Sequence, residues 1–247
     1  MKKLALTVLL AALFASGVTP AVAALSVPEK LIYDVSWSGI KAGTAVQEVT
    51  SLDGELHIVY TVRSSGWIDS FFPIDDKTES VLSRGSEAEQ FGMPTIFREK
   101  INEGKTHTWK EAQFDLARLK VETKDFLKHT EKSDPLSAKT FDTLSCIYFI
   151  RASVLVPGKP LHLDIFDLKR VWNTEVRVVK REELRTARGK FKTIVVRPTL
   201  RSEGVKPRTD YMTVWLTDDE RRIPVKMTVK LKVGEFEAIL VGGSYWQ

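Results

Sequence analysis

The chain has 247 residues, of which 43% are hydrophobic and 28% are charged, so it can form a large domain with a substantial core. The 37 basic residues only slightly exceed the 32 acidic ones, and this mild excess does not indicate nucleic acid binding. Because Cys146 is the single cysteine, an intramolecular disulfide is excluded and the fold depends on its core alone.

The first residues have the three parts of a secretory signal peptide. Two lysines follow the initial methionine, residues 4–15 are uncharged and apolar, and an Ala-x-Ala sequence ends at Ala23. A transmembrane anchor, the alternative, would need about 20 apolar residues, whereas small and polar residues interrupt this run early. We therefore expect residues 1–23 to be cleaved as a signal peptide and residues 24–247 to be exported to the periplasm as a single β-rich domain.

Apolar and polar residues alternate along much of the chain, which is typical of strands with one face on a core and the other in water. The clearest run is residues 225–233, followed by a hairpin turn at Gly234. Residues 30–37 and 56–62 show the same pattern, and Asp53-Gly54 is a strong hairpin signal. Further strands are predicted over residues 46–49, 95–102, 105–114, 118–124, 161–166, 171–179, 191–199, 211–216 and 236–240.

One segment does not fit this alternation. Residues 142–151 are apolar almost all round and Asp142 is placed as an N-cap, so we expect a short helix that covers or plugs one end of the β structure. Ten or more strands around it predict a mainly β fold, a single antiparallel β-barrel-like or sandwich domain with one short buried helix. The number of strands then decides whether the interior is filled by side chains or holds a ligand.

Three sequence blocks are distinctive in content and order. Residues 33–43 contain Gly-Ile-Lys-Ala-Gly, residues 142–151 form the predicted helix, and residues 215–225 contain Trp-Leu-Thr-Asp-Asp. Together the blocks resemble the bacterial family catalogued as domain of unknown function 3108. This resemblance implies an exported, β-rich single domain and carries over no catalytic residues, because it implies no accepted activity.

Residues able to support catalysis or metal binding are few and scattered. The four histidines, His57, His107, His129 and His162, have no pair at metal-ligand spacing. No Gly-x-Ser-x-Gly elbow, Walker loop or dinucleotide motif occurs. Cys146 lies inside the apolar helix, which favours an inert buried thiol over a nucleophile. The sequence therefore favours a non-enzymatic protein without metal or cofactor.

A basic group and an aromatic group are the candidates for ligand or surface contact. The basic group, which could bind phosphate groups, comprises Arg221, Arg222, Lys226, Lys230 and Lys232. Protection of an exposed strand edge is the alternative explanation of these lysines. The aromatic group comprises Trp67, Phe71 and Phe72, in a predicted turn or short helix over residues 66–73.

The function predicted from these features is a non-enzymatic binding or carrier module for an amphiphilic envelope component, with the β interior as the site and the basic group at its mouth. The expected ligands are lipid, lipopolysaccharide or glycan, and no nucleic acid partner or membrane-spanning segment is expected. Alternatives are a structural or assembly protein that contacts other envelope proteins, a hydrolase without a recognisable motif, and an outer-membrane barrel. The last suits the charged loops and the central helix poorly.

Overall fold

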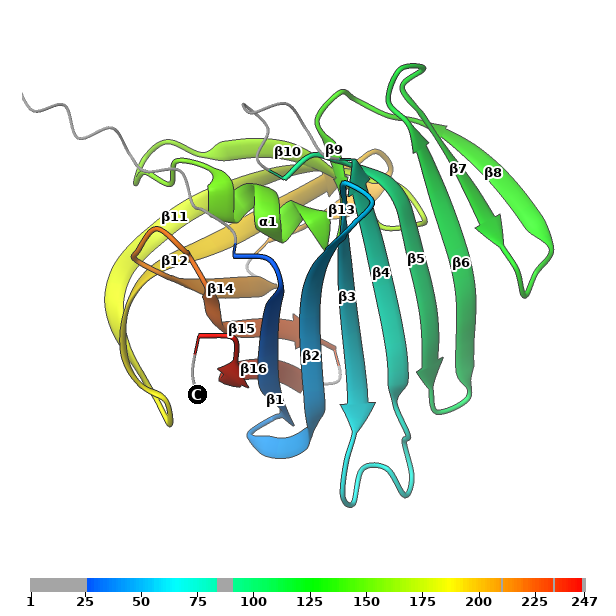
Figure 1. The fold of residues 1–247 in the computed structure, drawn as a ribbon. Helices are drawn as coiled ribbons and strands as arrows, with labels where there is room; N and C mark the ends of the chain where they lie inside the picture. Colours follow the sequence, from blue (N-terminus) through cyan, green and yellow to red (C-terminus); the bar gives the residue numbers. More distant parts are fainter. Residues whose placement is uncertain (1–25, 84–90, 210, 233, 246–247) are drawn as a thin grey trace, which may run out of the picture.

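The computed structural model of the chain describes residues 26–83, 91–209, 211–232 and 234–245 (Figure 1). The predicted signal peptide, Val233 and Trp246 lie outside these residues. The single helix in the described part is α1 (Ser145–Ala152). The strands are β1 (Glu29–Trp37), β2 (Ile40–Leu52), β3 (Glu55–Ser64), β4 (Asp75–Ser83), β5 (Met93–Glu103), β6 (Thr106–Asp115), β7 (Lys120–Asp125), β8 (Thr130–Pro135), β9 (Thr140–Asp142), β10 (Leu161–Phe166), β11 (Val171–Thr186), β12 (Gly189–Ser202), β13 (Val205–Arg208), β14 (Met212–Thr217), β15 (Pro224–Leu231) and β16 (Gly234–Gly243).

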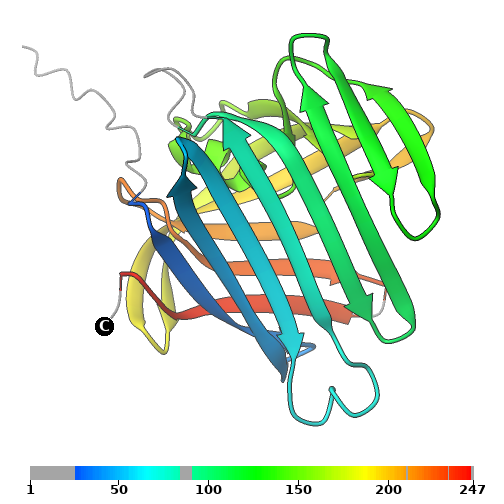
Figure 2. The same cartoon turned by 45° about the vertical axis from the view of Figure 1, so that its right-hand side comes forward.

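All of these strands belong to one sheet. Its order is β8-β7-β6-β5-β4-β3-β2-β1-β16-β15-β14-β12-β11-β10-β9, with β13 paired to β12 beside this path. The pairs are antiparallel except for β9 and β10. The sheet twists and folds over itself, so that the layer from β1 to β8 crosses the layer from β10 to β16 (Figure 2). The prediction of a mainly β, antiparallel fold, barrel-like or sandwich, with one short helix is confirmed, and the continuous sheet favours the barrel-like alternative.

Tight turns set the register of the first hairpins. Asp53 and Gly54 both have positive φ, 52° and 82°, as a two-residue hairpin turn requires, and Leu52 pairs with Glu55 beside them. Gly43 pairs with Ser64 at a point of close approach, where an added Cβ would lie 2.2 Å from the Arg63 carbonyl oxygen. A glycine is therefore required at the end of the Gly-Ile-Lys-Ala-Gly block.

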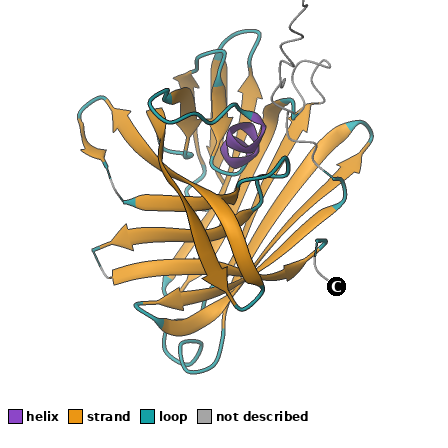
Figure 3. Ribbon diagram, turned by 90° about the vertical axis from the view of Figure 1, so that its left-hand side faces the viewer, coloured by secondary structure: helices purple, strands orange, loops and turns teal. Residues whose placement is uncertain are grey.

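Helix α1 lies between the two layers, where Figure 3 shows it nearly end-on. It begins three residues later than predicted, and its N-cap is Leu144 rather than Asp142. The Asp142 carboxylate nevertheless accepts the backbone N–H groups of Leu144 (2.8 Å) and Ser145 (2.9 Å). Asp142 therefore satisfies the first free donors of the helix from the preceding strand, β9.

Several strands differ from the sequence prediction in extent, and β4, β8, β9 and β13 were not predicted. β8 reads Thr-Glu-Lys-Ser-Asp-Pro and is largely exposed, so it carries no apolar alternation and is held by its pairing with β7. β11 and β12 extend to a turn near Gly189, well past the predicted ends. Exposed hairpin arms of this kind give no hydrophobic period for a sequence pattern to detect.

The strand predicted over residues 225–233 corresponds to β15, and its predicted burial is correct only at the start. Val225 is fully buried, Val229 is half-buried, and Leu231 is 54% exposed. Neither Val229 nor Leu231 belongs to a hydrophobic cluster of the core. The alternating pattern therefore continues beyond the point at which the core ends.

Candidate functional site

A cavity of about 390 Å³ lies inside the folded sheet beside α1. Most of its lining is apolar and comes from α1 and from the strands of the second layer. These side chains are Leu144, Cys146, Ile147, Ile150, Ile165, Trp172, Val176, Val196, Pro198, Leu200, Met212, Val214 and Met227. Polar lining residues are Gln47, Tyr60, Thr78, Thr143, Asp167, Arg208 and Tyr211.

The apolar walls follow from the periodicities of the elements that form them. On β12, Val196, Pro198 and Leu200 are two residues apart and therefore point to the same face of the sheet. On α1, Ile147 and Ile150 are three residues apart and share one side of the helix. An apolar face of the sheet and an apolar side of the helix thus line the cavity.

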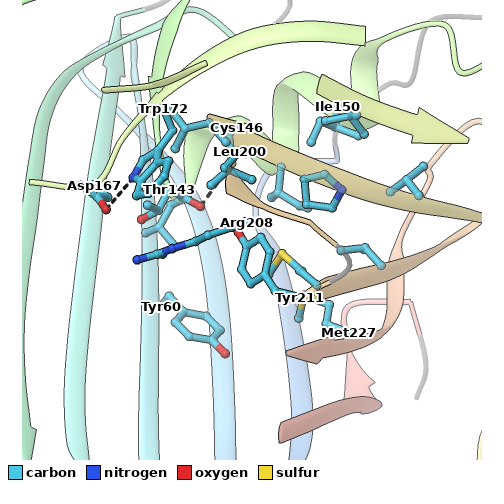
Figure 4. A pocket seen from close by; sticks show the side chains of 18 of the residues that line it. Tyr60, Thr143, Cys146, Ile150, Asp167, Trp172, Leu200, Arg208, Tyr211 and Met227 are labelled. Carbon is cyan, nitrogen blue, oxygen red and sulfur yellow. Dashed lines mark hydrogen bonds between the residues drawn. The ribbon is translucent and has the colours of Figure 1, made fainter. Parts of the chain in front are cut away.

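The polar lining residues include a small cluster at one side of the cavity, seen in Figure 4 near Asp167 and Tyr60, while Ile150 and Met227 lie at the other side. The Arg208 guanidinium carbon is 4.6 Å from the ring centre of Trp172. Trp172 donates its indole N–H to Asp167 Oδ2 at 2.8 Å. Arg208 is exposed to solvent although it lines the cavity, so this side is the mouth.

Asp167 has a structural role in the turn between β10 and β11. Its Oδ1 accepts the backbone N–H groups of Lys169 (3.1 Å) and Arg170 (3.0 Å), which closes the turn. Its Oδ2 holds the indole of Trp172. The carboxylate is therefore hydrogen-bonded on both oxygens before any ligand arrives.

Two tyrosines face the cavity as protonated donors. Burial, together with the nearby carboxylate of Asp76, raises the pKa of Tyr60 to about 12. Burial also raises the pKa of Tyr211 to about 12, with Cys146 adding to the shift and the Arg208 charge opposing it. At neutral pH each hydroxyl keeps its proton and can donate to an acceptor.

Cys146 is buried in the cavity wall, as predicted. Burial raises the pKa of its thiol far above the ordinary value, and Asp142 raises it further. The sulfur lies 3.4 Å from the Thr143 carbonyl oxygen as a donor. A thiol in this setting is not a thiolate at neutral pH. That it is dispensable for function stays a prediction.

Another side of α1 carries a buried ion pair instead of a cavity. Arg151 forms two hydrogen bonds of 2.7 Å to the carboxylate of Glu29, and both side chains are almost fully buried. Tyr148 and Tyr245 donate their hydroxyls to the same carboxylate at 3.2 and 2.7 Å. Arg151 also donates to the Arg221 carbonyl oxygen, at 3.1 Å from Nη2. This network fixes the C-terminal end of α1 to β1.

The N-terminal end of α1 is fixed through Asp142, which is fully buried. Its Oδ2 accepts the hydroxyls of Ser80 (2.6 Å) and Ser145 (2.8 Å). Because Ser80 belongs to β4 in the first layer, this bond crosses the interior. Burial raises the pKa of the Asp142 carboxyl, and these hydrogen bonds oppose the shift.

The basic group predicted from the sequence lies outside the cavity lining. Arg221 pairs with Asp219 at 2.9 Å, and Arg222 donates to the carbonyl oxygens of Arg151 and Ser153 at the C-terminal end of α1. Through Arg222 and the Arg221 carbonyl oxygen, the β14–β15 turn is therefore connected to the helix.

The three lysines of the basic group lie on or beside β15. Lys226 pairs with Glu237 at 2.5 Å, and its ammonium lies 5.2 Å from the ring centre of Trp215. Lys230 is 3.9 Å from Glu235, and Lys232 is exposed. The structure thus places the lysines on a partly paired surface and not at the mouth of the cavity, and their contact with a ligand stays a prediction.

The aromatic group forms the tip of the connection between β3 and β4, as a turn rather than a helix. Trp67, Phe71 and Phe72 are 47%, 60% and 44% exposed, and the rings of Trp67 and Phe71 are 5.0 Å apart. Phe72 packs on Gly104, where an added Cβ would lie 2.8 Å from its ring. None of the three lines the cavity, so their role in contact stays a prediction.

Sequence reasoning did not identify Arg208 at the cavity mouth, or the Glu29–Arg151 ion pair that fixes the C-terminal end of α1. Arg208 lies in β13, a strand without apolar alternation, so nothing distinguished it from other surface arginines. Glu29 precedes the first predicted strand. Arg151 was detectable, because a charge at the end of an otherwise apolar helix needs a partner when it is buried.

Two further properties concern the described residues only. Within these ranges, no three His, Cys, Asp or Glu side chains gather in a way that could hold a metal ion. No helix in the same part of the chain combines the length and the apolar composition needed to cross a membrane.

Comparisons with known proteins identify a family and a similar fold. The family described as "Protein of unknown function (DUF3108)" matches residues 32–241. No curated protein matches the chain. Among solved structures, the chain is similar to a β-barrel-like protein of domain of unknown function DUF1849 from Brucella abortus, with a TM-score of 0.61 and 15% identity over 88% of this chain and 97% of that chain. At this identity, the similarity concerns the fold alone.

Proposed function

This chain belongs to the DUF3108 family of proteins of unknown function, and we propose that it is a binding or carrier module that holds a small amphiphilic molecule in the cavity beside α1. The cavity itself carries the proposal. Its volume of about 390 Å³ lies within the range of roughly 300 to 1,000 Å³ that is usual for small-molecule sites. Its mostly apolar lining with a few polar groups at the mouth also matches such sites.

The free-energy cost of leaving this cavity empty supports the presence of a bound ligand. Protein interiors are normally close-packed, and empty space among aliphatic side chains removes dispersion contacts. Here the space persists although β12, β14 and α1 surround most of it with apolar side chains. A bound alkyl chain would restore the missing contacts, whereas water would find few partners along these walls.

The chemistry of the lining favours binding over catalysis. The thiol of Cys146 and the hydroxyls of Tyr60 and Tyr211 have raised pKa values, so none is an activated nucleophile at neutral pH. Asp167 is already hydrogen-bonded within its turn. These groups suit the orientation of a ligand rather than its conversion.

Export to the bacterial periplasm belongs to the same proposal and is supported by the signal-peptide pattern of residues 1–23. Cell fractionation followed by N-terminal sequencing tests it. We expect a periplasmic product that begins near Ala24. A product that keeps Met1 and sediments with the inner membrane would contradict export.

A steric block of the cavity tests the proposed function. Ile147 is a half-buried lining residue, so Ile147→Trp should fill the space. Calorimetric titration with decanol, a neutral ten-carbon amphiphile, should show saturable binding to the native protein and at least tenfold weaker binding to the variant. Ile40→Trp is the matched control, because Ile40 is 53% exposed and does not line the cavity.

Melting curves of both variants show whether they fold. Met212→Trp, at another half-buried lining position on β14, replaces Ile147→Trp if that variant is unstable. The proposal fails if decanol does not bind the native protein saturably. It also fails if a folded variant with a filled cavity binds decanol as well as the Ile40→Trp control does.

A further inference from the structure

We infer that the cavity selects an amphiphile with an acidic head group, a carboxylate or a phosphate, and that Arg208 is the residue that recognises it. The inference rests on the proposed function and names the class of ligand for the same cavity. It is carried by the position and bonding of Arg208 at the mouth, with Trp172 beneath it.

The side chain of Arg208 differs from that of Arg151 in its partners. Arg151 is buried and saturated by Glu29 and a backbone carbonyl. The Arg208 side chain stacks on Trp172, and within the described ranges its guanidinium forms no ion pair or hydrogen bond. Its planar fork of N–H donors is therefore available, and it matches the two oxygens of a carboxylate or phosphate.

The indole of Trp172 holds this guanidinium in place. Trp172 is 1% exposed, and Asp167 fixes its ring through the 2.8 Å hydrogen bond from Nε1. A guanidinium that already stacks on a rigid ring loses less side-chain freedom when a ligand binds. The mouth is thus organised before the ligand enters.

The other polar groups at the cavity mouth are compatible with a ligand that accepts hydrogen bonds. The two Asp167 oxygens are engaged by Lys169, Arg170 and Trp172, and among the described residues this carboxylate forms no ion pair with Arg208. Tyr211, whose raised pKa reflects its burial and whose titration is influenced by the Arg208 charge, keeps a hydroxyl proton to donate. The free groups are donors, and donors select an anionic acceptor.

The part of the cavity away from Arg208 determines which apolar group the ligand can carry. Ile150 and Met227 lie on the other side of the cavity from Asp167 in Figure 4, and most of the lining is apolar. An acid at Arg208 would therefore carry its apolar part inward, toward α1. The limited volume favours one short alkyl chain, or a ring of similar size.

A matched ligand series measures this selectivity. Decanoate, decyl phosphate, decanol and decyltrimethylammonium share the alkyl chain and differ in the head group. In calorimetric titrations, the native protein should bind the two acids about tenfold to hundredfold more tightly than decanol, as a charge-assisted contact predicts. The cation should bind least. The ratio between decanoate and decyl phosphate separates a carboxylate ligand from a phosphate ligand.

Arg208→Gln should remove the preference for the acids and leave the affinity for decanol within about twofold. Arg208→Lys keeps the charge without the planar fork, so its preference should be intermediate. Arg201→Gln is the matched control, since Arg201 lies on the neighbouring strand β12 and does not line the cavity. Unchanged decanol binding also shows that Arg208→Gln is folded.

The outcomes separate the inference from the proposed function. If decanol binds but neither acid binds more tightly, or if Arg208→Gln keeps the acid preference, the acidic ligand is wrong and the cavity function stands. If none of the four compounds binds saturably, the proposed function itself fails. Equal losses in Arg208→Gln and Arg201→Gln would indicate a general effect of surface charge and would also overturn the inference.

Discussion

The two sides of helix α1 differ in how their space is filled. On the side toward β1 and β2, Tyr148 and Arg151 meet Glu29 in a closed network in which each charged group has a partner. On the other side, Ile147 and Ile150 face a cavity of about 390 Å³. The same eight residues thus close-pack on one side and leave an open space on the other.

This difference shows how the fold can hold a cavity without losing the helix that walls it. Collapse of α1 into the empty space would break the Arg151 ion pair at one end and the Asp142 hydrogen bonds at the other. Breaking a buried ion pair is costly, because the remaining charge has no partner. The packed side therefore keeps the hollow side open.

Loss of the ion pair is the strongest way to break this arrangement. Arg151→Met should lower the free energy of unfolding by about 3 to 5 kcal/mol, because Glu29 would stay buried without a counter-charge. Urea denaturation followed by tryptophan fluorescence measures the change. A loss below about 1 kcal/mol would show that the pair does not fix α1.

The double variant Glu29→Leu with Arg151→Met sharpens that test. Removal of both charges leaves no unpaired group, so the double variant should be more stable than Arg151→Met alone. If the two single substitutions are additive in the double variant, Glu29 and Arg151 act separately and the comparison must be revised.

The N-terminal anchor of α1 should have a somewhat smaller effect. Asp142→Ala leaves the Ser80 hydroxyl and the N–H groups of Leu144 and Ser145 without their acceptor, which should cost about 2 to 3 kcal/mol. Asp142→Asn keeps one acceptor oxygen for the two N–H groups and should cost less. Equal losses for the two variants would point to lost packing instead of lost hydrogen bonds.

The pH dependence of Asp142→Asn gives an independent check. Burial raises the folded-state pKa of Asp142 above its unfolded value of about 3.9. Its contribution to stability is therefore fully present below that unfolded value and is lost as the pH rises through the folded pKa. The melting temperature of Asp142→Asn relative to the native protein should consequently increase from pH 4 to pH 8. A constant or falling difference would contradict the raised pKa.

The sequence was informative where burial follows a simple period and uninformative where it depends on long-range partners. Alternation predicted β1, β3 and β10 closely, and the apolar run predicted α1 to within three residues. The cavity depends on side chains from β3, α1, β12 and β13 that meet only when the sheet folds over. Local patterns contain no information about that closure.

The charges illustrate the same limit. Clustering in the sequence drew attention to the basic group of residues 221–232, in which Arg221, Lys226 and Lys230 pair with acidic residues of the same hairpins. Arg151 and Arg208 belong to no such cluster, yet the fold places Arg151 in the buried ion pair and Arg208 at the cavity mouth. A cluster of charges can be recognised in the sequence, whereas the partner of a single charge is known only from the fold.

Replacement of Cys146 should have a modest effect on the wall of the cavity. Cys146→Ala removes one buried sulfur beside an existing space, so we expect a loss of about 1 kcal/mol and no loss of decanol binding. In the folded native protein, the thiol should not react with iodoacetamide at pH 8. Rapid alkylation, or loss of binding in a stable Cys146→Ala variant, would contradict an inert thiol.

The smallest expected effect concerns the exposed end of β15. Lys230→Glu together with Lys232→Glu should change the free energy of unfolding by less than about 0.5 kcal/mol, because both side chains are solvated and the Lys230–Glu235 pair is long, at 3.9 Å. The sequence-based alternatives for these lysines, a lipid-binding face or edge protection, then separate by sedimentation with anionic vesicles at low and high salt. A binding face predicts salt-sensitive association that the double reversal abolishes. Edge protection predicts that the native protein does not sediment with the vesicles. In either case, Arg208→Gln should leave sedimentation with vesicles unchanged, because the cavity mouth and the lysine surface share no residue.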